Sequence, residues 1–359
     1  MSTEIETANK ISNFNDPAGK NMKRLKLFGL VVTVLGVGLF SYFVYTVGLN
    51  EIFAGIAGIG LGGFVVILLI YCLRIYVRSI SWRLSVSKPY KLKIRDTFPA
   101  VIIGEALSSM IPMGILISGT AKAVAVRNRI PMIVGFSSVA TENLFFSFIT
   151  GLFICSGTIA FLQRFDLPET WGYLLNAIVG GIIFLTIVGI LMVVRQWHWV
   201  SAVCSWLYEK KLLTGILKNG RHQVRLFESQ IYGFYRQYPQ RFVPICLLQA
   251  LFHTLGILEV WFILSRIGDL FPKVSTAFFL ESISRLITTF FKLIPFLVGV
   301  DEAGAEFVAE ALVAGVGIGV TLAIIRKGRG LFWAAIGMLL IIKRGLSFKE
   351  IQRFQIKNE

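Results

Sequence analysis

The stretch "TFPAVIIGEALSSMIPMGILISGTAKA", residues 97–123, decides how the chain can fold. It is apolar enough to enter a bilayer, yet Pro112, Gly114 and Gly119 interrupt it, and basic sequence flanks it on both sides. A helix that crossed the membrane here would leave Lys122 and the arginines after it on the outer side, although basic loops stay in the cytoplasm. We therefore expect a re-entrant hairpin that enters and leaves on the cytoplasmic side, with Pro112 and Gly119 as hinge points.

The composition places this hairpin in a membrane protein. Of the 359 residues, 55% are hydrophobic and 16% are charged, whereas soluble domains carry about 25% charged residues. The apolar runs are continuous rather than alternating, which favours helices over a barrel. The predicted fold is an all-α polytopic bundle with six full spans of about 20 residues each. The spans are 27–47, 54–73, 143–162, 172–194, 244–267 and 318–342.

Basic residues indicate which loops are cytoplasmic. They concentrate in the N-terminal tail (1–26) and in residues 74–95 and 195–241, while 48–53 and 163–171 hold few. Both termini, including the tail 346–359, are therefore expected inside a cell (inner) membrane. Residues 195–243 mix Trp, Leu and Phe with Lys and Arg, so we expect an amphipathic segment on anionic lipid at the inner surface. The same lipid explains the net charge of +16 without a nucleic-acid partner.

A second interrupted segment, residues 274–315, contains "IPFLVGVDEAGAEFVAE" (294–310). Pro295, Gly299 and Gly304 break it and serve as predicted hinges; it reads as a hairpin from the external side. Irregular backbone at membrane depth is tolerated only inside protein or beside a watery cavity. The halves 27–162 and 163–345 then form a pseudo-inverted repeat. That architecture is typical of secondary transporters, whose substrate site lies near the midplane.

Charged residues within these segments are the candidate site. Each charge at the bilayer centre costs about 2.5–3.5 kcal/mol, so such residues usually face a bundle interior or a pathway. Glu302 and Glu306 share a helix face, and Asp301 suits a helix N-terminus. The alternative is that these charges form structural ion pairs or lie at an aqueous edge. The candidate substrate-binding residues are Glu105, Lys122, Glu142, Glu281, Arg285, Asp301, Glu302, Glu306 and Arg326.

These motifs resemble the flippase-like membrane family that includes the transmembrane region of lysylphosphatidylglycerol synthases. The matches are residues 112–122, Glu142 in "ATENL", "IPFLVGVDEAG" with Glu302, and Arg326. The resemblance covers about residues 25–345. The chain departs from the family pattern at Asn143, where an arginine is usual, and at Gly299, where the family has two glycines. The resemblance implies that the protein handles an amphipathic lipid such as a phospholipid or a polyprenyl-phosphate carrier.

The leading functional hypothesis is a lipid flippase with membrane lipid as substrate. Lys122, Arg285 and Arg326 would meet phosphate, while Glu142 and Glu302 would balance charge or bind a coupling proton. An aminoacyl-phospholipid synthase or glycosyltransferase is disfavoured, because the sequence shows no nucleotide-binding glycine loop, Ser-His-Asp set or metal cluster. We therefore expect no catalysis, cofactor or metal. A scaffold or subunit for a separately encoded lipid-modifying enzyme remains a third hypothesis.

Overall fold

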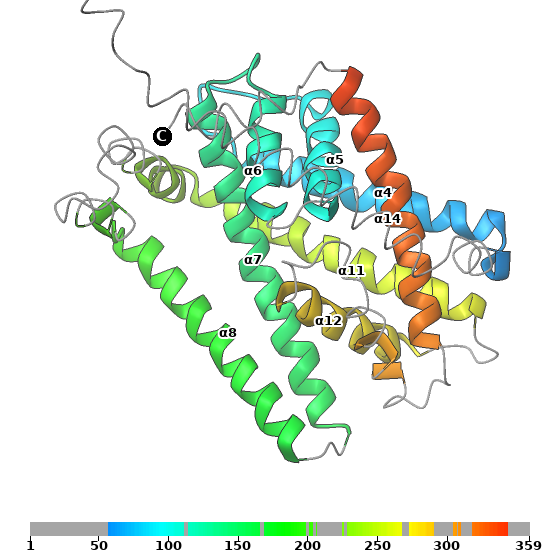
Figure 1. The fold of residues 1–359 in the computed structure, drawn as a ribbon. Helices are drawn as coiled ribbons and strands as arrows, with labels where there is room; N and C mark the ends of the chain where they lie inside the picture. The colour runs from blue at the N-terminus through cyan, green and yellow to red at the C-terminus, as the bar shows by residue number, and fades with distance from the viewer. Residues whose placement is uncertain are drawn as a thin grey trace, which may run out of the picture.

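The computed structural model is a bundle of helices (Figure 1). No strand occurs in the part of the chain that it describes. That part consists of residues 57–110, 114–165, 169–198, 201–203, 206, 225, 228–267, 273–290, 304–306, 308–309 and 318–343.

The first half contributes four described helices, which are α4 (Leu61–Leu84), α5 (Ile94–Met110), α6 (Gly114–Ala125) and α7 (Met132–Leu162). Gly60 precedes α4 with a φ of 79°. This left-handed conformation is one that residues with a side chain rarely adopt, so the glycine marks where α4 begins. With a rise of 1.5 Å per residue, α7 is about 46 Å long, which exceeds the hydrocarbon thickness.

The second half contributes α8 (Glu169–Arg195), the short 3₁₀ helix η1 (Pro239–Arg241), α11 (Phe242–Ile267), α12 (Val274–Phe290) and α14 (Ile318–Lys343). α8 packs against α7 and diverges from the rest of the bundle (Figure 1). Its outer side carries Phe184 and Leu185, which are 65% and 69% exposed. Such large apolar side chains are suited to contact with lipid.

Three described helices are long and apolar enough to cross a membrane, namely Leu61–Leu84, Met132–Leu162 and Pro239–Ile267. They correspond to the second, third and fifth predicted spans. α8 and α14 coincide closely with the predicted spans 172–194 and 318–342. The first predicted span, 27–47, lies outside the described residues, as do the tails 1–26 and 346–359. The prediction of an all-α membrane bundle is confirmed.

Two predicted span boundaries were wrong. The span 54–73 is in fact helix Leu61–Leu84, so Arg74 and Arg78 belong to the helix and not to a cytoplasmic loop. The span 143–162 is in fact Met132–Leu162, so Glu142 lies inside α7. The physical reason is that a charged side chain paired within a bundle does not end a membrane helix. Counting charges along the sequence ended the first of these spans too early and began the second too late.

The interrupted stretch 97–123 forms two helices, α5 and α6, that pack against each other. Gly104 of α5 lies so close to α6 that a Cβ there would be 2.9 Å from the side-chain carbons of Lys122. Gly119 lies within α6, whereas Pro112 is in the break, residues 111–113, outside the described residues. The helix pair has the form of the predicted hairpin. Its entry from the cytoplasmic side stays a prediction.

The second hairpin is described in part. α12 is its first arm, and residues 304–306 and 308–309 are helical. A Cβ on Gly304 would collide with Ile287 of α12, so the two arms are in contact. Pro295 and Gly299 lie outside the described residues.

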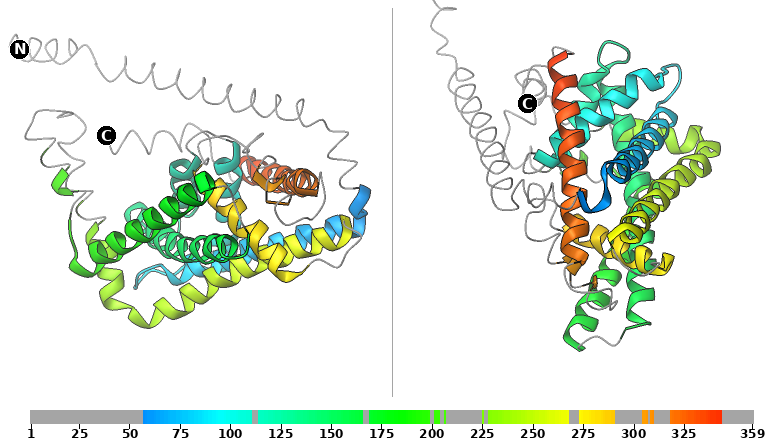
Figure 2. Two further views of the ribbon diagram at one scale, coloured as in Figure 1. Left: turned by 90° about the horizontal axis from the view of Figure 1, so that it is seen from below. Right: turned by 90° about the vertical axis from the view of Figure 1, so that its right-hand side faces the viewer.

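The last described helix of each half packs against the first hairpin arm of the other half. α4 and α11 run side by side in opposite directions (Figure 2). α7, the last helix of the first half, packs on α12, and α14, the last helix of the second half, packs on α5. Both contacts are made at a glycine, because Gly157 faces Ser282 and Gly337 faces Ala106. Two inverted repeats around a pseudo-two-fold axis would produce this arrangement.

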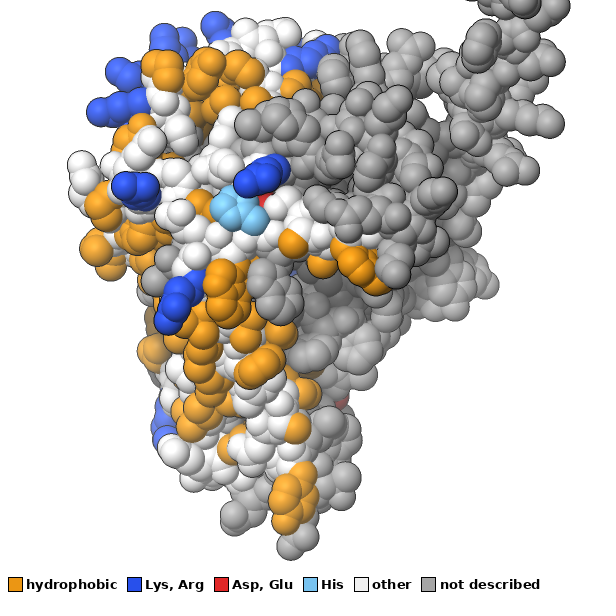
Figure 3. Space-filling model, turned by 90° about the vertical axis from the view of Figure 1, so that its left-hand side faces the viewer, with side chains coloured by type: hydrophobic (Ala, Val, Ile, Leu, Met, Phe, Trp, Pro, Cys, Tyr) orange, Lys and Arg blue, Asp and Glu red, His pale blue; other side chains and the backbone are white. Residues whose placement is uncertain are grey.

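One end of the bundle is basic. Lys and Arg side chains gather at the upper end of the space-filling view, above a broad hydrophobic surface (Figure 3). The exposed basic residues where α4 ends, where α5 and α7 begin and where α14 ends are Arg83, Lys88, Lys91, Lys93, Arg95, Arg129 and Lys343. This is the distribution that the positive-inside rule associates with a cytoplasmic face.

Candidate functional site

α4 has a polar inner face and an apolar outer face. Tyr71, Arg74 and Arg78 lie at spacings of three and four residues, so their side chains share one side of the helix. Arg74 is only 1% exposed. Leu69 and Leu73 on the other side are exposed, as a lipid-facing surface requires. The helix therefore directs two arginines into the protein interior.

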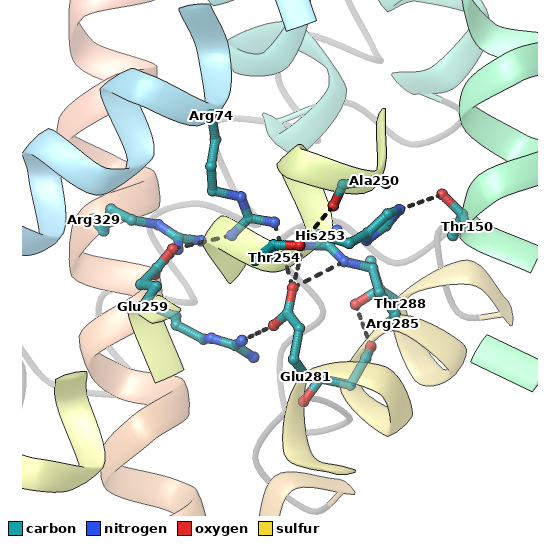
Figure 4. A network of polar contacts seen from close by, with 12 residues as sticks. Arg74, Thr150, Ala250, His253, Thr254, Glu259, Glu281, Arg285, Thr288 and Arg329 are labelled. Carbon is teal, nitrogen blue, oxygen red and sulfur yellow. Dashed lines mark hydrogen bonds and ion pairs between the residues drawn. The ribbon is translucent and has the colours of Figure 1, made fainter. Parts of the chain in front are cut away.

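The first of these arginines belongs to a network that connects α4, α11, α12 and α14 (Figure 4). Arg74 donates from Nη1 to Glu259 of α11 at 3.0 Å and from Nη2 to Glu281 of α12 at 3.4 Å. Glu281 also accepts from Nη2 of Arg285 at 2.9 Å. We call this network the arginine cluster, and its members are Arg74, Glu259, Glu281, Arg285, Arg326 and Arg329.

α14 joins the arginine cluster through two arginines three residues apart. Arg326 pairs with Glu281, and Arg329 pairs with Glu259. Both carboxylates have side chains no more than 1% exposed. Each glutamate thus holds cations from more than one helix, and the network ties α14 to α11 and α12.

Aromatic rings enclose the arginine cluster. The guanidinium of Arg74 lies 4.4 Å from the ring centre of Phe252, and that of Arg329 lies 4.1 Å from the ring centre of Tyr71. These cation–π contacts stabilise a guanidinium that is shielded from water. His253 is stacked on Phe153 at 4.7 Å, and its Nε2 lies 3.0 Å from the hydroxyl of Thr150.

The second network connects the first hairpin to α4, α7 and α11. Glu142 of α7 accepts from Nε of Arg78 at 3.0 Å and from Nε2 of Gln249 at 3.3 Å. Nζ of Lys122 lies 3.7 Å from the same carboxylate, and Arg78 also pairs with Glu105 of α5. We call this network the Glu142 cluster, and its members are Arg78, Ser81, Glu105, Lys122, Glu142, Asn143 and Gln249.

The two networks are neighbours with different charge balance. Arg74 and Arg78 are separated by one turn of α4, a rise of about 6 Å. The Glu142 cluster has two cations and two carboxylates, whereas the arginine cluster has four arginines and two glutamates. Among the described residues, the arginine cluster therefore has a formal excess of two positive charges. Such an excess is unfavourable, because burying an uncompensated charge costs several kcal/mol.

Both networks retain partly accessible side chains. Arg285 is 23% exposed and Glu105 is 29% exposed. These two side chains are therefore not fully enclosed by the protein. No group of three or more His, Cys, Asp or Glu side chains that could hold a metal ion occurs in the described part of the chain. The side chains of the two networks offer charge pairing and hydrogen bonding.

The structure brings together six of the nine predicted substrate-binding residues, in two groups. Glu105, Lys122 and Glu142 lie in the Glu142 cluster. Glu281, Arg285 and Arg326 lie in the arginine cluster. Glu306 is engaged elsewhere, since its carboxylate accepts the backbone N–H of Val320 at 3.0 Å. Asp301 and Glu302 lie outside the described residues.

Sequence reasoning missed several members of these networks, and Arg74 and Arg78 are the most important. Both were assigned to a cytoplasmic loop. In "YCLRIYVR", residues 71–78, the tyrosine and both arginines recur at helical spacing while most of the other residues are apolar. That periodicity predicts a charged inner face and would have identified both residues. Glu259, Arg329, Gln249 and Ser81 were likewise absent from the predicted site.

Comparison with known proteins agrees with the apolar helices. A family model described as the lysylphosphatidylglycerol synthase TM region matches residues 27–337. No curated protein and no solved structure matches the chain. The matched residues include both hairpins and both ion networks. The chain therefore belongs to the family of the lysylphosphatidylglycerol synthase transmembrane region and is an integral membrane protein with a role connected to membrane lipid.

Proposed function

We propose that the protein is a lipid flippase that moves an anionic phospholipid or a polyprenyl-phosphate-linked lipid between leaflets. The headgroup would pass along the two ion networks while the acyl or prenyl chains stay in the bilayer. The observation that carries this proposal is the arginine cluster, a buried network with more cations than carboxylates among the described residues. Intramembrane charges of this kind usually mark a substrate pathway.

The arrangement of the networks also supports transport. Each network connects a hairpin arm to the central pair α4 and α11, because Glu105 belongs to α5 and Glu281 belongs to α12. Transporters with inverted repeats bind substrate between such elements and move one repeat against the other. A headgroup that competes for these ion pairs would loosen a hairpin arm from the central helices.

A liposome assay tests the proposal. Purified protein is reconstituted with fluorescent phosphatidylglycerol, phosphatidylcholine or polyprenyl phosphate, and leaflet exchange is measured by quenching with an impermeant reductant. We expect faster exchange of one of the anionic lipids than of phosphatidylcholine. Arg326→Gln should slow exchange, while Arg83→Gln, an exposed arginine at the end of α4, should not. Equal rates for protein-free and protein-containing liposomes would refute transport.

A second candidate function is a membrane-embedded scaffold or subunit of a separately encoded lipid-modifying enzyme. The description of the family favours it, since the family is named for the membrane region of a synthase. Co-purification of an enzyme together with no leaflet exchange would support this function over transport. We infer that the chain itself is not the catalyst. The buried glutamates of both networks are held by arginines, which disfavours their use as general acids.

We also infer that the protein resides in a cell (inner) membrane with its basic end toward the cytoplasm. The exposed lysines and arginines at that end support this orientation through the positive-inside rule. Anionic lipid at the inner surface is then the partner expected for these side chains.

A further inference from the structure

Among the described residues, the arginine cluster holds more cations than carboxylates. Four guanidinium groups face two carboxylates within the described residues, and all six side chains are at least three-quarters buried. In the neighbouring Glu142 cluster, cations and carboxylates are equal in number. If the arginine cluster served only to hold helices together, its cations and carboxylates would also be expected to be equal in number, because each uncompensated buried charge opposes folding. The imbalance is therefore specific to one of the two networks.

The hydrogen-bond donors of the cluster lead to the same conclusion. Within the described part of the chain, the Nε atoms of Arg74, Arg326 and Arg329 are buried without a hydrogen-bond partner. An arginine presents five N–H donors in a rigid fork. The carboxylates of Glu259 and Glu281 each accept from arginines of different helices, so they satisfy only part of these donors. An acceptor that carries negative charge and several oxygens would complement these donors.

We propose that the arginine cluster is a binding site for a phosphate group, and that Glu281 and Glu259 compete with the phosphate for the same guanidinium groups. Arg326 and Arg329 would be the principal donors on α14, and Arg285 the donor on α12. The chemistry is a phosphate oxyanion, either at a lipid headgroup or as a free anion. The inference deepens the proposed function, but binding can be measured without transport.

Phosphate fits this site better than a small halide. Guanidinium forks match two oxygens of a phosphate at once, and such charge-assisted pairs are stronger than neutral hydrogen bonds. A phosphate monoester carries about −1.5 to −2 charges at neutral pH, close to the excess of two, and a diester carries about half of that. The rings of Tyr71 and Phe252 pack against the guanidinium groups of Arg329 and Arg74 and restrict their orientation. The donors are thus oriented before the ligand arrives.

Because phosphate and the carboxylates would compete for the same guanidinium groups, arginine and glutamate substitutions should have opposite effects on phosphate binding. Removing an arginine removes donors for phosphate, so Arg326→Gln should weaken binding. Removing a competing carboxylate frees donors, so Glu281→Gln should tighten phosphate binding even if it lowers the stability of the unliganded protein. If the network only holds the helices together, both variants should lose stability and phosphate should not affect them differently from the unmodified protein.

The experiment is a thermal unfolding titration of the full-length protein in an uncharged detergent at constant ionic strength, maintained with gluconate. One arm adds inorganic phosphate, a second adds short-chain phosphatidylglycerol, and a third adds short-chain phosphatidylcholine as a lipid without net charge. A ligand that binds the folded state raises the unfolding midpoint with its concentration. We expect an apparent dissociation constant about tenfold weaker for Arg326→Gln and about tenfold tighter for Glu281→Gln, each equivalent to about 1.4 kcal/mol.

Matched variants keep the outcome clear. Arg83→Gln removes an exposed arginine and should leave every titration unchanged. Arg329→Gln and Glu259→Gln test the same opposite effects at the second arginine–glutamate pair. They replace the Arg326 and Glu281 variants if either of those does not fold. Stabilisation by phosphatidylglycerol alone assigns the site to a lipid headgroup, and stabilisation by both anions assigns it to phosphate in general. No stabilisation by either anion, or the same shift in Arg→Gln and Glu→Gln variants, overturns the proposal. Phosphate binding without leaflet exchange in liposomes would leave the site intact and reject the flippase function.

Discussion

At the scale of the residue, Arg74 shows how a charge is accommodated inside a membrane bundle. Its two Nη atoms reach Glu259 and Glu281, which belong to different helices. Phe252 contacts its guanidinium face at 4.4 Å from the ring centre. A planar fork with several donors makes all three contacts at once, and a lysine ammonium on a flexible stem cannot do so. The choice of arginine is therefore a matter of geometry as well as of charge.

We expect Arg74→Lys to destabilise the protein although the charge is retained. The substitution loses one of the two charge-assisted hydrogen bonds, and such bonds are worth about 1.5–3 kcal/mol each. The unfolding midpoint in detergent, followed by tryptophan fluorescence, should fall. Arg83→Lys on the exposed end of the same helix should leave the midpoint within experimental error. Equal midpoints for the two variants would show that Arg74 contributes only a charge.

A glycine beside the arginine cluster offers a second test. A Cβ on Gly256 would collide with the carboxylate of Glu281 and lie 3.1 Å from Nη2 of Arg74. Gly256→Ala should therefore displace Glu281 and lower the unfolding midpoint, even though alanine is the better helix former by about 1 kcal/mol. Gly180→Ala on the lipid side of α8 meets no atom within 4 Å and should be neutral or slightly stabilising. If both variants behave alike, the close approach at Gly256 is not structurally important.

At the scale of the element, apolar length predicted the bounds of α8, α11 and α14, whereas paired charges obscured those of α4 and α7. α8, α11 and α14 begin and end near the predicted residues because their apolar runs have few charged interruptions near their ends. α4 continues to Leu84 through Arg74 and Arg78, whose acidic partners come from α5, α7, α11 and α12. Partners this distant in sequence are invisible to a local hydropathy window. The same long-range pairing explains why Lys122 and Glu142 could be nominated separately but not joined.

The first hairpin predicts a specific labelling pattern. In the structure α7 separates the loop before it from the turn after it by more than a bilayer core, whereas α5 and α6 return to the same end. We expect Tyr90→Cys and Asn128→Cys, both exposed, to react with an impermeant maleimide from the same side. Arg164→Cys, beyond the other end of α7, should react from the opposite side. The background is a variant without Cys72, Cys155, Cys204 and Cys246. Reaction of Tyr90→Cys and Asn128→Cys from opposite sides would mean that 97–123 crosses the membrane.

At the scale of the whole molecule, the contacts between the halves repeat one pattern. Gly157 of α7 meets Ser282 and Phe278 of α12, and Gly337 of α14 meets Ala106 and Ile102 of α5. In each hairpin arm the contacted pair is one helical turn apart, and a glutamate of an ion network directly precedes the small residue. These glutamates are Glu281 and Glu105. The correspondence is evidence for an inverted repeat that sequence similarity between the halves barely reveals.

The same correspondence makes a matched prediction for both interfaces between the halves. Gly157→Ala and Gly337→Ala each place a methyl group against the opposite arm, and overpacking of this kind costs about 1–3 kcal/mol. Truncating the opposite residue should relieve the collision, so Ser282→Gly should partly rescue Gly157→Ala, and Ala106→Gly should partly rescue Gly337→Ala. Double-mutant cycles on the unfolding midpoint should give coupling of the same sign, about 0.5–3 kcal/mol for residues in contact. Rescue should be weaker at Gly337, because the backbone oxygen of Ile102 remains 3.1 Å from the new Cβ. Rescue at only one glycine would show that the two interfaces do not play equivalent roles and would contradict the inverted repeat.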